Sequence, residues 1–439
     1  MTSDLKLYAV PHSEAIPESA HPLRRRSLSL KILLWGTFSL LCFGPLAFGA
    51  VERWSILVIE LGSAVLYCLV LLRDPPHAFS MRWRSLSTPL SLFAALIMIQ
   101  LTLATSAYRY VTLVVLLFYS ALCLIFWLVG YLASFETSQV ALGIAFSIFG
   151  ITLAVFALLQ DAISPHKIYG LVEPPYSAYV FGPYVNHSHY AGLMEMLFPL
   201  PLIIGLNRTF PPWARVSMVL GALVMLVSIC ISQSRGGIIA AGCQLVVVGI
   251  MLARDRNFRH SLLLLASVLL GTAVLIWIFR APNLSGRIAS LFDPLSVNVL
   301  GFRRMVFWDS TRMIVSRPLL GWGLGTFSLV FPAFKTFRAT VLVNAAHNDY
   351  LQLMVETGSA GFLCLVWFLW RYAALSLKHC HRFTVNRRNA ISTAAFVGTM
   401  GIAVHSFADF NMQIPANAAF FFALCALSVR KSDRALAGE

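Results

Sequence analysis

The stretch VTLVVLLFYSALCLIFWLVGYL, residues 111–132, contains no charged side chain and decides the class of fold. A helix rises about 1.5 Å per residue, so roughly 20 apolar residues cross the hydrocarbon core of a bilayer. The whole chain is 58% hydrophobic and 12% charged, with a mean hydropathy of +0.77. Soluble domains carry about 25% charged residues. We therefore predict an all-α integral membrane protein, since the weakly alternating segments of membrane β-barrels are absent.

Working outward from this stretch, similar apolar blocks predict about twelve transmembrane helices. The expected spans are 32–50, 54–72, 89–105, 111–132, 140–159, 188–206, 216–232, 237–252, 262–279, 350–377, 390–406 and 415–429. This divides the chain into a disordered tail (1–29), nine spans (30–279), a large polar loop (280–346), three spans (347–430) and a short tail (431–439). The first span follows three arginines, as in a signal peptide, but its length favours a retained anchor.

The basic residues indicate which side of the membrane each loop faces. If both termini are cytoplasmic, the short inner segments hold 21 Lys and Arg residues and the short outer segments hold four. Short cytoplasmic loops are enriched in Lys and Arg, so we expect a multi-pass protein with both tails inside. The net charge of +15 is explained by this topology and gives no reason to expect nucleic acid as a partner.

The large loop, 280–346, is basic although we expect it on the outer side. It carries eight basic residues, seven of them Arg, against Asp293 and Asp309. Long loops escape the topology rule. One interpretation is a solvated surface attracted to anionic lipid. The other is a site for an anionic ligand, because the guanidinium fork suits phosphate oxygens.

Two local structures are expected inside this loop. Residues 303–314 read as a helix with Trp308 and Met313 at apolar positions, and it should stop at Arg317-Pro318 because proline cannot continue a helix. Residues 321–325, GWGLG, then predict a flexible turn. A lone G-x-G without a preceding strand is weak evidence for phosphate binding.

Polar side chains gather at the expected outer ends of several spans, where membrane helices rarely carry them without a role. They are Asn186, His187, His189, Glu195, Arg235, His347, Asn348, Asp349, Glu356, His405 and Asp409. Structural alternatives exist: Asn186 and Asn348 could cap helices, and Asp409 could pair with His405 one turn away. Because the whole set lies on one side beside a basic loop, we interpret it as a functional site.

This combination of residues favours one type of chemistry. A histidine can act as a general base near neutral pH, and arginines can stabilise charge that develops on a diphosphate. At a membrane boundary, these groups suit attack of a hydroxyl on a sugar carbon while a lipid-linked diphosphate departs. Diphosphate leaves readily, and the large loop has no D-x-D motif or metal-ligand spacing. We therefore expect no metal and no cofactor.

The eight cysteines add little to this picture. Seven fall inside apolar blocks, and Cys380 lies in a basic linker. None lies in the large loop and no C-x-x-C spacing occurs, so disulfides and structural zinc are not expected.

Several motifs, in order along residues 180–415, resemble the O-antigen ligase and polymerase superfamily. They are the run 186–192 (NHSHYAG), Ser234-Arg235-Gly236-Gly237, Arg304-x-x-x-Trp308, the run 317–327 beginning RPLLGWG, and Ala346-His347-Asn348-x-x-Leu351 followed by Glu356-Thr357-Gly358. His187 and His189 depart from the family pattern, in which other polar residues are common at these positions. The first 180 residues match only as generic spans.

The resemblance implies a metal-independent, inverting glycosyltransferase of the bacterial inner membrane with a long periplasmic loop. Its donor would be a glycan on undecaprenyl diphosphate, and its acceptor lipid A-core for a ligase or another lipid-linked glycan for a polymerase. His347 would be the catalytic base. Arg235 and Arg304 would bind the diphosphate, and we add Arg303 and Arg287 from the same basic loop. The remaining outer-end polar residues would support them.

Two other classes of function fit parts of the pattern. A transporter of a polyanionic lipid would suit twelve spans and a basic cavity, although transporters place their sites near the midplane within repeated halves. We find no duplicated half. A scaffold for polysaccharide export would tolerate loss of Arg235 and Arg304.

Overall fold

The computed structural model describes residues 20–74, 84–165, 167–174, 179–254, 266, 270–271, 297–337 and 343–429. The regular elements of these residues are all helices, and the described residues form no strand apart from two isolated β-bridges. The prediction of an all-α protein is confirmed. The expected span 262–279, apart from residues 266 and 270–271, lies outside the described residues, and so do the final tail 431–439 and Arg287.

The described residues up to Ser316 form ten helices. Their bounds are α1 (Ala20–Leu46), α2 (Arg53–Arg73), α4 (Arg84–Thr102), α5 (Arg109–Ala133), α6 (Glu136–Ile163), α7 (His187–Leu197), α8 (Pro199–Leu206), α9 (Pro212–Ile231), α10 (Arg235–Ala253) and, beyond the gap, α13 (Val297–Ser316). Helix α1 begins at Ala20, so residues 20–29 of the expected tail are helical. Residues 1–19 are outside the described part.

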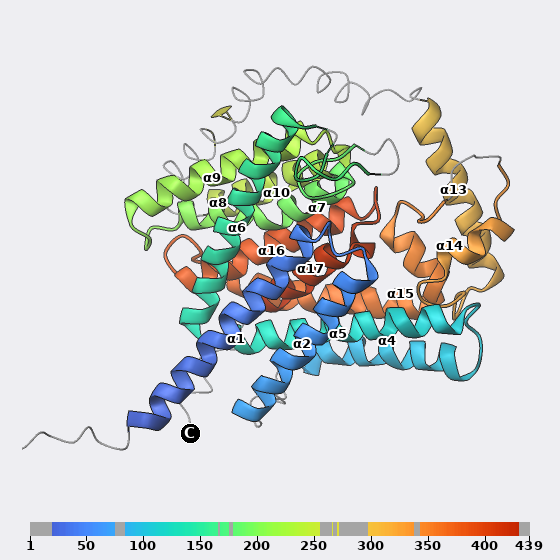
Figure 1. Ribbon diagram of the computed structural model, residues 1–439, viewed down its shortest axis with the longest axis horizontal. Coiled ribbons are helices and arrows are strands. Elements are labelled where there is room, and N and C mark those ends of the chain that lie inside the picture. The colour runs from blue at the N-terminus through green and yellow to red at the C-terminus, as the bar shows by residue number, and fades with distance from the viewer. Residues whose placement is uncertain are drawn as a thin grey trace, which may run out of the picture.

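The remaining elements complete the bundle. They are α14 (Phe327–Val330), η2 (Phe331–Ala333), α15 (Asp349–Ser376), η3 (Leu377–His379), α16 (Arg387–His405), η4 (Asn411–Gln413) and α17 (Pro415–Ser428). Figure 1 shows α16 and α17 in the middle of the bundle, with α4, α5 and α15 running side by side below them. Helices α13 and α14 lie beyond the end where α15 begins.

Nine helical stretches in the described part of the chain are long and apolar enough to cross a membrane. They coincide with nine of the twelve expected spans. The two expected spans 390–406 and 415–429 do form helices, α16 and α17, but α16 does not meet this standard and α17 is short. Every residue of α17 is buried, and most of α16 is too. Helices that pack against protein rather than lipid tolerate small and polar residues, which explains their weaker hydropathy.

The helix ends gather at two opposite ends of the bundle. At one end, which we call the basic end, the Asn207 amide donates to the Phe383 carbonyl at 2.7 Å, and Arg387 donates to the Thr209 carbonyl at 2.6 Å. At the other end, which we call the polar end, α13 and α15 meet the 406–413 loop between α16 and α17. These contacts bring the connections before α9 and α16 together at one end, and the starts of α13 and α15 to the α16–α17 connection at the other.

The GWGLG segment is a turn held against the membrane helices, as predicted. The Trp322 and Gly323 amides donate to the Val355 and Glu356 carbonyls at 3.0 and 2.9 Å. Gly321 has φ +67°, and a Cβ there would lie 2.5 Å from the Glu356 carbonyl carbon. Only glycine fits so close an approach of two backbones.

Helix α13 ends at Ser316, immediately before Arg317-Pro318, where the sequence predicts its end. Met313 is fully buried, as expected from its apolar position, but Trp308 is 67% exposed. The buried face of α13 runs through Val306, Asp309 and Met313. Trp308 lies on the opposite side of this helix, together with the exposed Arg304.

Candidate functional site

The 406–413 loop is the structural centre of the polar end. Ser406 Oγ and the Met412 amide both donate to Asp349 Oδ2, at 2.9 and 3.0 Å. The Asn348 side-chain amide donates to the Phe407 carbonyl at 3.1 Å, and Arg303 donates to the Ala408 carbonyl at 2.8 Å. The starts of α13 and α15 are thus both fastened to the connection between α16 and α17.

His347 lies beside this loop in an unusual backbone conformation. Its φ of +52° falls in the left-handed region, which few non-glycine residues occupy and which is often found at functional sites. Its ring meets the edge of Phe410, with 5.1 Å between ring centroids. The side chain is 30% exposed, so His347 is positioned by its surroundings and still accessible to a ligand.

The nearest acidic group to the His347 ring is Asp409. Nδ1 of His347 and Oδ1 of Asp409 are 3.7 Å apart, too far for a hydrogen bond but within ion-pair range when the ring is protonated. Burial alone would raise the pKa of Asp409. The neighbouring His347, His189 and His405, with a hydrogen bond from the Phe410 amide, instead hold that pKa below its ordinary value. Asp409 is therefore a fixed anion facing the imidazole.

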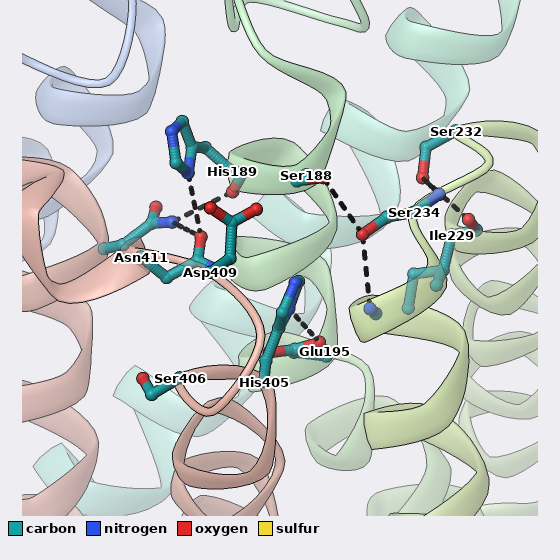
Figure 2. Close-up of polar contacts among 12 residues, drawn as sticks. Ser188, His189, Glu195, Ile229, Ser232, Ser234, His405, Ser406, Asp409 and Asn411 are labelled. Carbon is teal, nitrogen blue, oxygen red and sulfur yellow. Dashed lines mark hydrogen bonds and ion pairs between the residues drawn. The ribbon is translucent and has the colours of Figure 1, made fainter. Parts of the chain in front are cut away.

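His405 has a different partner from the one that its sequence neighbourhood suggests. Its Nδ1 lies 3.0 Å from Oε2 of Glu195 on α7, and both side chains are fully buried (Figure 2). The alternative in which Asp409 pairs with His405 at one helical turn is replaced by Glu195–His405 and His347–Asp409.

The His405 ring also lies directly against the start of α10. A Cβ on Gly236 would fall 2.2–2.3 Å from the His405 ring atoms Cδ2 and Nε2, so a side chain at position 236 would displace the ring. Gly236 follows Arg235, the first residue of α10. The Glu195–His405 pair therefore fixes the backbone that carries Arg235.

Arg235 itself is half-buried at the start of α10. Ser234 caps the helix, accepting from the Gly237 amide at 3.2 Å and approaching Ser188 Oγ at 3.4 Å (Figure 2). With the residues that the structure describes, the Arg235 side chain forms no hydrogen bond or ion pair. A guanidinium next to the free amides of a helix N-terminus suits an anion.

The two arginines of α13 differ in their surroundings. Arg303 is half-buried and donates to the 406–413 loop, whereas Arg304 is exposed and contacts no other described residue through a hydrogen bond or ion pair. Arg303 is the one that the structure fastens to the 406–413 loop, at the carbonyl of the residue before Asp409. The Arg304 side chain leaves α13 about 100° around the helix axis from that of Arg303, because a helix has about 3.6 residues per turn.

His189 belongs to a buried polar network. Its Nδ1 lies 3.2 Å from Asn411 Oδ1, and its carbonyl accepts from Asn417 at 2.9 Å (Figure 2). Tyr184 OH donates to Asn417 Oδ1 at 2.9 Å. This network connects α7 to η4 and α17, so the buried His189 side chain supports the 406–413 loop from inside the bundle and is not exposed to a ligand.

Other expected site residues have structural tasks. Asn186 caps α7, accepting from the Ser188 amide at 2.8 Å, and Asn348 caps α15, accepting from the Leu351 amide at 2.9 Å. His187 packs its ring edge-on against Tyr179 at 4.9 Å. The capping alternative is thus confirmed for both asparagines.

Glu356 serves the GWGLG turn. Its carboxylate accepts from the Gly325 and Phe327 amides, at 2.8 and 3.3 Å, and from the Gln352 side chain at 3.2 Å. It is 2% exposed. The structure therefore places the Glu356 carboxylate as an internal support for the GWGLG turn and the start of α14.

Sequence reasoning missed the His347–Asp409 and Glu195–His405 pairings, and it missed the role of the 406–413 loop. The one available signal was the density of Asp, Asn and Gln between residues 409 and 417. All eight cysteines are free thiols. No group of three or more His, Cys, Asp or Glu residues that could hold a metal occurs in the described ranges.

Comparison with known proteins is consistent with this geometry. Residues 220–366 match a family model described as O-antigen ligase. The match spans Arg235, Arg303, Arg304 and His347, and it supports the O-antigen ligase and polymerase superfamily. It thereby suggests an O-antigen ligase or polymerase activity. No curated protein matches the chain significantly.

Proposed function

We propose that this protein transfers a glycan from undecaprenyl diphosphate to an acceptor hydroxyl at the periplasmic face of the bacterial inner membrane. The acceptor in our leading proposal is lipid A-core, as for an O-antigen ligase. The observation that carries the proposal is the His347 imidazole, accessible and set 3.7 Å from the Asp409 carboxylate. It lies at the end of the bundle where Arg235 and Arg303 also lie.

In this mechanism, His347 is the general base. Its imidazole takes the proton of the acceptor hydroxyl while the oxygen attacks the anomeric carbon of the donor sugar. The bond from that carbon to the diphosphate breaks, so the anomeric centre inverts and undecaprenyl diphosphate leaves. The imidazolium that forms is stabilised by Asp409, in the way that a buried aspartate stabilises the histidine of a catalytic triad.

The arginines stabilise the departing diphosphate. The guanidinium groups of Arg235 and Arg304 form no hydrogen bond or ion pair with other described residues. Arg303 extends from α13 to the 406–413 loop. Positive charge aimed at the leaving group stabilises the transition state more than the ground state. Arg287, outside the described residues, is proposed as a further contributor from the same basic loop. Because these residues supply the charge, the proposal requires no metal.

The proposed topology follows from charge and from the arrangement of helix ends. We infer that the basic end faces the cytoplasm with both termini, and that the polar end with residues 280–346 faces the periplasm. The basic end holds Arg208, Arg215, Arg371, Arg387 and Arg388. The positive-inside rule favours this orientation over its reverse.

An O-antigen polymerase is the second candidate, because the family match covers ligases and polymerases and both use the same donor. A lipid transporter is less well supported. The ionisable groups of Asp349, His347 and Asp409 gather around the 406–413 loop at the polar end of the bundle, whereas transporters place their sites near the midplane.

Purified protein in lipid nanodiscs, supplied with a lipid-linked glycan donor, tests the proposal. A ligase joins the glycan to lipid A-core, and a polymerase joins it to a second lipid-linked glycan. Either covalent product supports the enzyme class, and their ratio identifies the acceptor. Movement of donor lipid between leaflets without any covalent product would contradict the proposal and favour transport.

A further inference from the structure

Helix α13 is fastened near both ends to loops that join helices of the bundle. Near its start, Arg303 donates to the Ala408 carbonyl in the 406–413 loop at 2.8 Å. Just after its end, Arg317 donates to the Thr105 carbonyl, between α4 and α5, at 2.7 Å. Held at these two points, α13 runs across the direction of α4 and α15 and not along it (Figure 1).

The loop between α4 and α5 indicates the depth at which α13 lies. Both helices are long and apolar enough to cross a membrane, so the short connection 103–108 lies at a membrane–water boundary. Tyr108 and Tyr110 are 50% and 72% exposed there, and tyrosine is enriched at this boundary. The Ala107 amide also donates to the Trp322 carbonyl of the GWGLG turn at 2.8 Å. The end of α13 is therefore held at the depth of the lipid headgroups.

The side of α13 that faces away from the bundle is largely apolar. Phe307, Trp308 and Val315 are 51%, 67% and 73% exposed, whereas Val306 on the opposite side is buried. Trp308 and Val315 are seven residues apart, so they lie on the same side of a helix with about 3.6 residues per turn. Large exposed apolar side chains that lie together mark a surface that binds a partner or a membrane. We call this side the outer face of α13, and its members are Arg304, Phe307, Trp308, Arg312 and Val315.

The outer face is also positively charged. Arg304 is exposed and forms no hydrogen bond or ion pair with another described residue. Arg312 is 52% exposed, although Asp309 lies 3.7 Å from it. Asp309 is the single acidic residue of the range 297–337, which holds five Lys and Arg residues. Its buried carboxylate accepts from the Thr336 amide at 2.8 Å. Aromatic rings beside arginines, without an exposed carboxylate, are typical of helices that lie in the surface of an anionic membrane.

We propose that the outer face of α13 lies in the headgroup layer of the membrane, at the polar end of the bundle, and binds anionic phospholipids. Phe307, Trp308 and Val315 contact the upper carbons of the acyl chains. Arg304 and Arg312 contact the phosphate groups, because a long arginine side chain can cover apolar surface with its methylene stem and keep its charge among the headgroups. The proposal depends on the placement of α13 and not on the transfer reaction.

Spin labels measure the depth of the outer face directly. A nitroxide is attached to Trp308→Cys or Val315→Cys in cysteine-free protein, in nanodiscs of phosphatidylcholine with about 30% phosphatidylglycerol. Its collisions with oxygen, which concentrates in lipid, are compared with its collisions with a water-soluble nickel chelate. The matched control is the exposed Ala333→Cys on η2, because Phe331 of η2 packs with Val306 on the inner side of α13. The oxygen-to-nickel ratio at positions 308 and 315 should exceed that at 333 by about threefold or more.

The composition of the lipid tests the role of the arginines. In phosphatidylcholine alone, the oxygen-to-nickel ratio at position 315 should fall by about twofold, because the attraction between arginine and anionic lipid is lost. Adding Arg312→Gln should make this ratio independent of phosphatidylglycerol. Adding Lys335→Gln removes a charge of the same segment that lies 5.3 Å from the Phe337 ring, and it should keep the dependence. Equal dependence in both variants would contradict the contact between Arg312 and lipid phosphate.

Two results would overturn the proposal. Nickel accessibility at positions 308 and 315 equal to that at 333 would place the outer face in water. Shielding of these labels from both oxygen and nickel would mean that protein covers the face instead of lipid.

The unmodified protein gives a further test that no misfolded variant can confuse. Phosphatidylglycerol with a photoactivatable headgroup should crosslink to residues 304–315 and not to residues 331–334, as located by mass spectrometry of peptides. Crosslinks to 331–334 alone would contradict the proposal. This result does not depend on whether any glycan is transferred, so it separates the membrane contact from the proposed function.

Discussion

Replacing Asp409 by Asn should reduce catalysis while leaving donor binding unchanged. Asparagine keeps the size of the side chain and removes its charge. Two unit charges 3.7 Å apart interact by about 4–5 kcal/mol at an effective dielectric constant of 20 and by about 1 kcal/mol in bulk water. Asp409 is buried and His347 is 30% exposed, so the loss lies between these limits. We expect kcat to fall by about 10- to 1,000-fold.

The pH dependence of the same variant follows from the pKa of Asp409. Its neighbours hold that pKa below its ordinary value, so the carboxylate stays ionised throughout a neutral assay range and does not itself titrate there. The loss of activity in Asp409→Asn should therefore be present across the whole neutral pH range.

Initial rates of glycan transfer by nanodisc-embedded protein, measured from pH 5 to 9 by mass spectrometry of the product, provide the assay. Glu173→Gln is the matched control. It removes an exposed carboxylate from the 164–186 loop, where the partner of Glu173 among the described residues is Lys167 at 2.9 Å, and it should retain wild-type kcat and pH profile. An Asp409→Asn protein with wild-type kcat across this pH range would refute the role given to this pair.

Three further predictions follow from the same geometry. Gly236→Ala should lower the free energy of unfolding by about 1–3 kcal/mol and cut transfer at least tenfold, because its Cβ would meet the His405 ring. Gly242→Ala on the same helix has open space around it and should leave thermal unfolding and transfer unchanged. Equal behaviour of the two variants would contradict the contact between position 236 and His405. Arg304→Lys should greatly reduce turnover of the diphosphate donor because it loses the bidentate fork; near-normal rates would mean that Arg304 contributes only bulk charge. In a cysteine-free background, Leu319→Cys should react with an impermeant maleimide in intact cells and Val385→Cys only after permeabilisation, and the opposite pattern would reverse the topology.

Local signals in the sequence were sufficient for much of the fold. Asn186 and Asn348 stand where helix caps are expected and do cap α7 and α15. Arg317-Pro318 ends α13 as predicted. Apolar block length located nine of the expected spans. Each of these features depends on residues within a few positions of one another, which is the range that a sequence pattern reports directly.

The interior of the bundle was harder to predict because it depends on contacts between distant segments. The hydropathy of α16 and α17 is determined by burial among other helices and not by lipid, so length and composition alone describe them poorly. Glu195 and His405 are 210 positions apart. Sequence neighbourhood suggested Asp409 as the partner of His405, and only the packing of α7 against α16 brings Glu195 closer.

In the candidate site, too, residue types predicted the region, whereas contacts between distant segments determined the role of each residue. Residue types identified the region: histidine, arginine and acidic side chains at one end of the spans do come together around the 406–413 loop. Residue types could not assign individual tasks. Glu356 was grouped with the site, yet its carboxylate holds the Gly325 and Phe327 amides of a turn.

The most direct test of the account is transfer by the His347→Ala protein. Purified variant and wild type, reconstituted at equal amounts and with the same thermal unfolding temperature, would be given the lipid-linked donor and the acceptor that wild type uses. The account predicts that donor still binds, because the arginines remain, and that transfer falls by at least 100-fold because the base is missing. Transfer at the wild-type rate would contradict it.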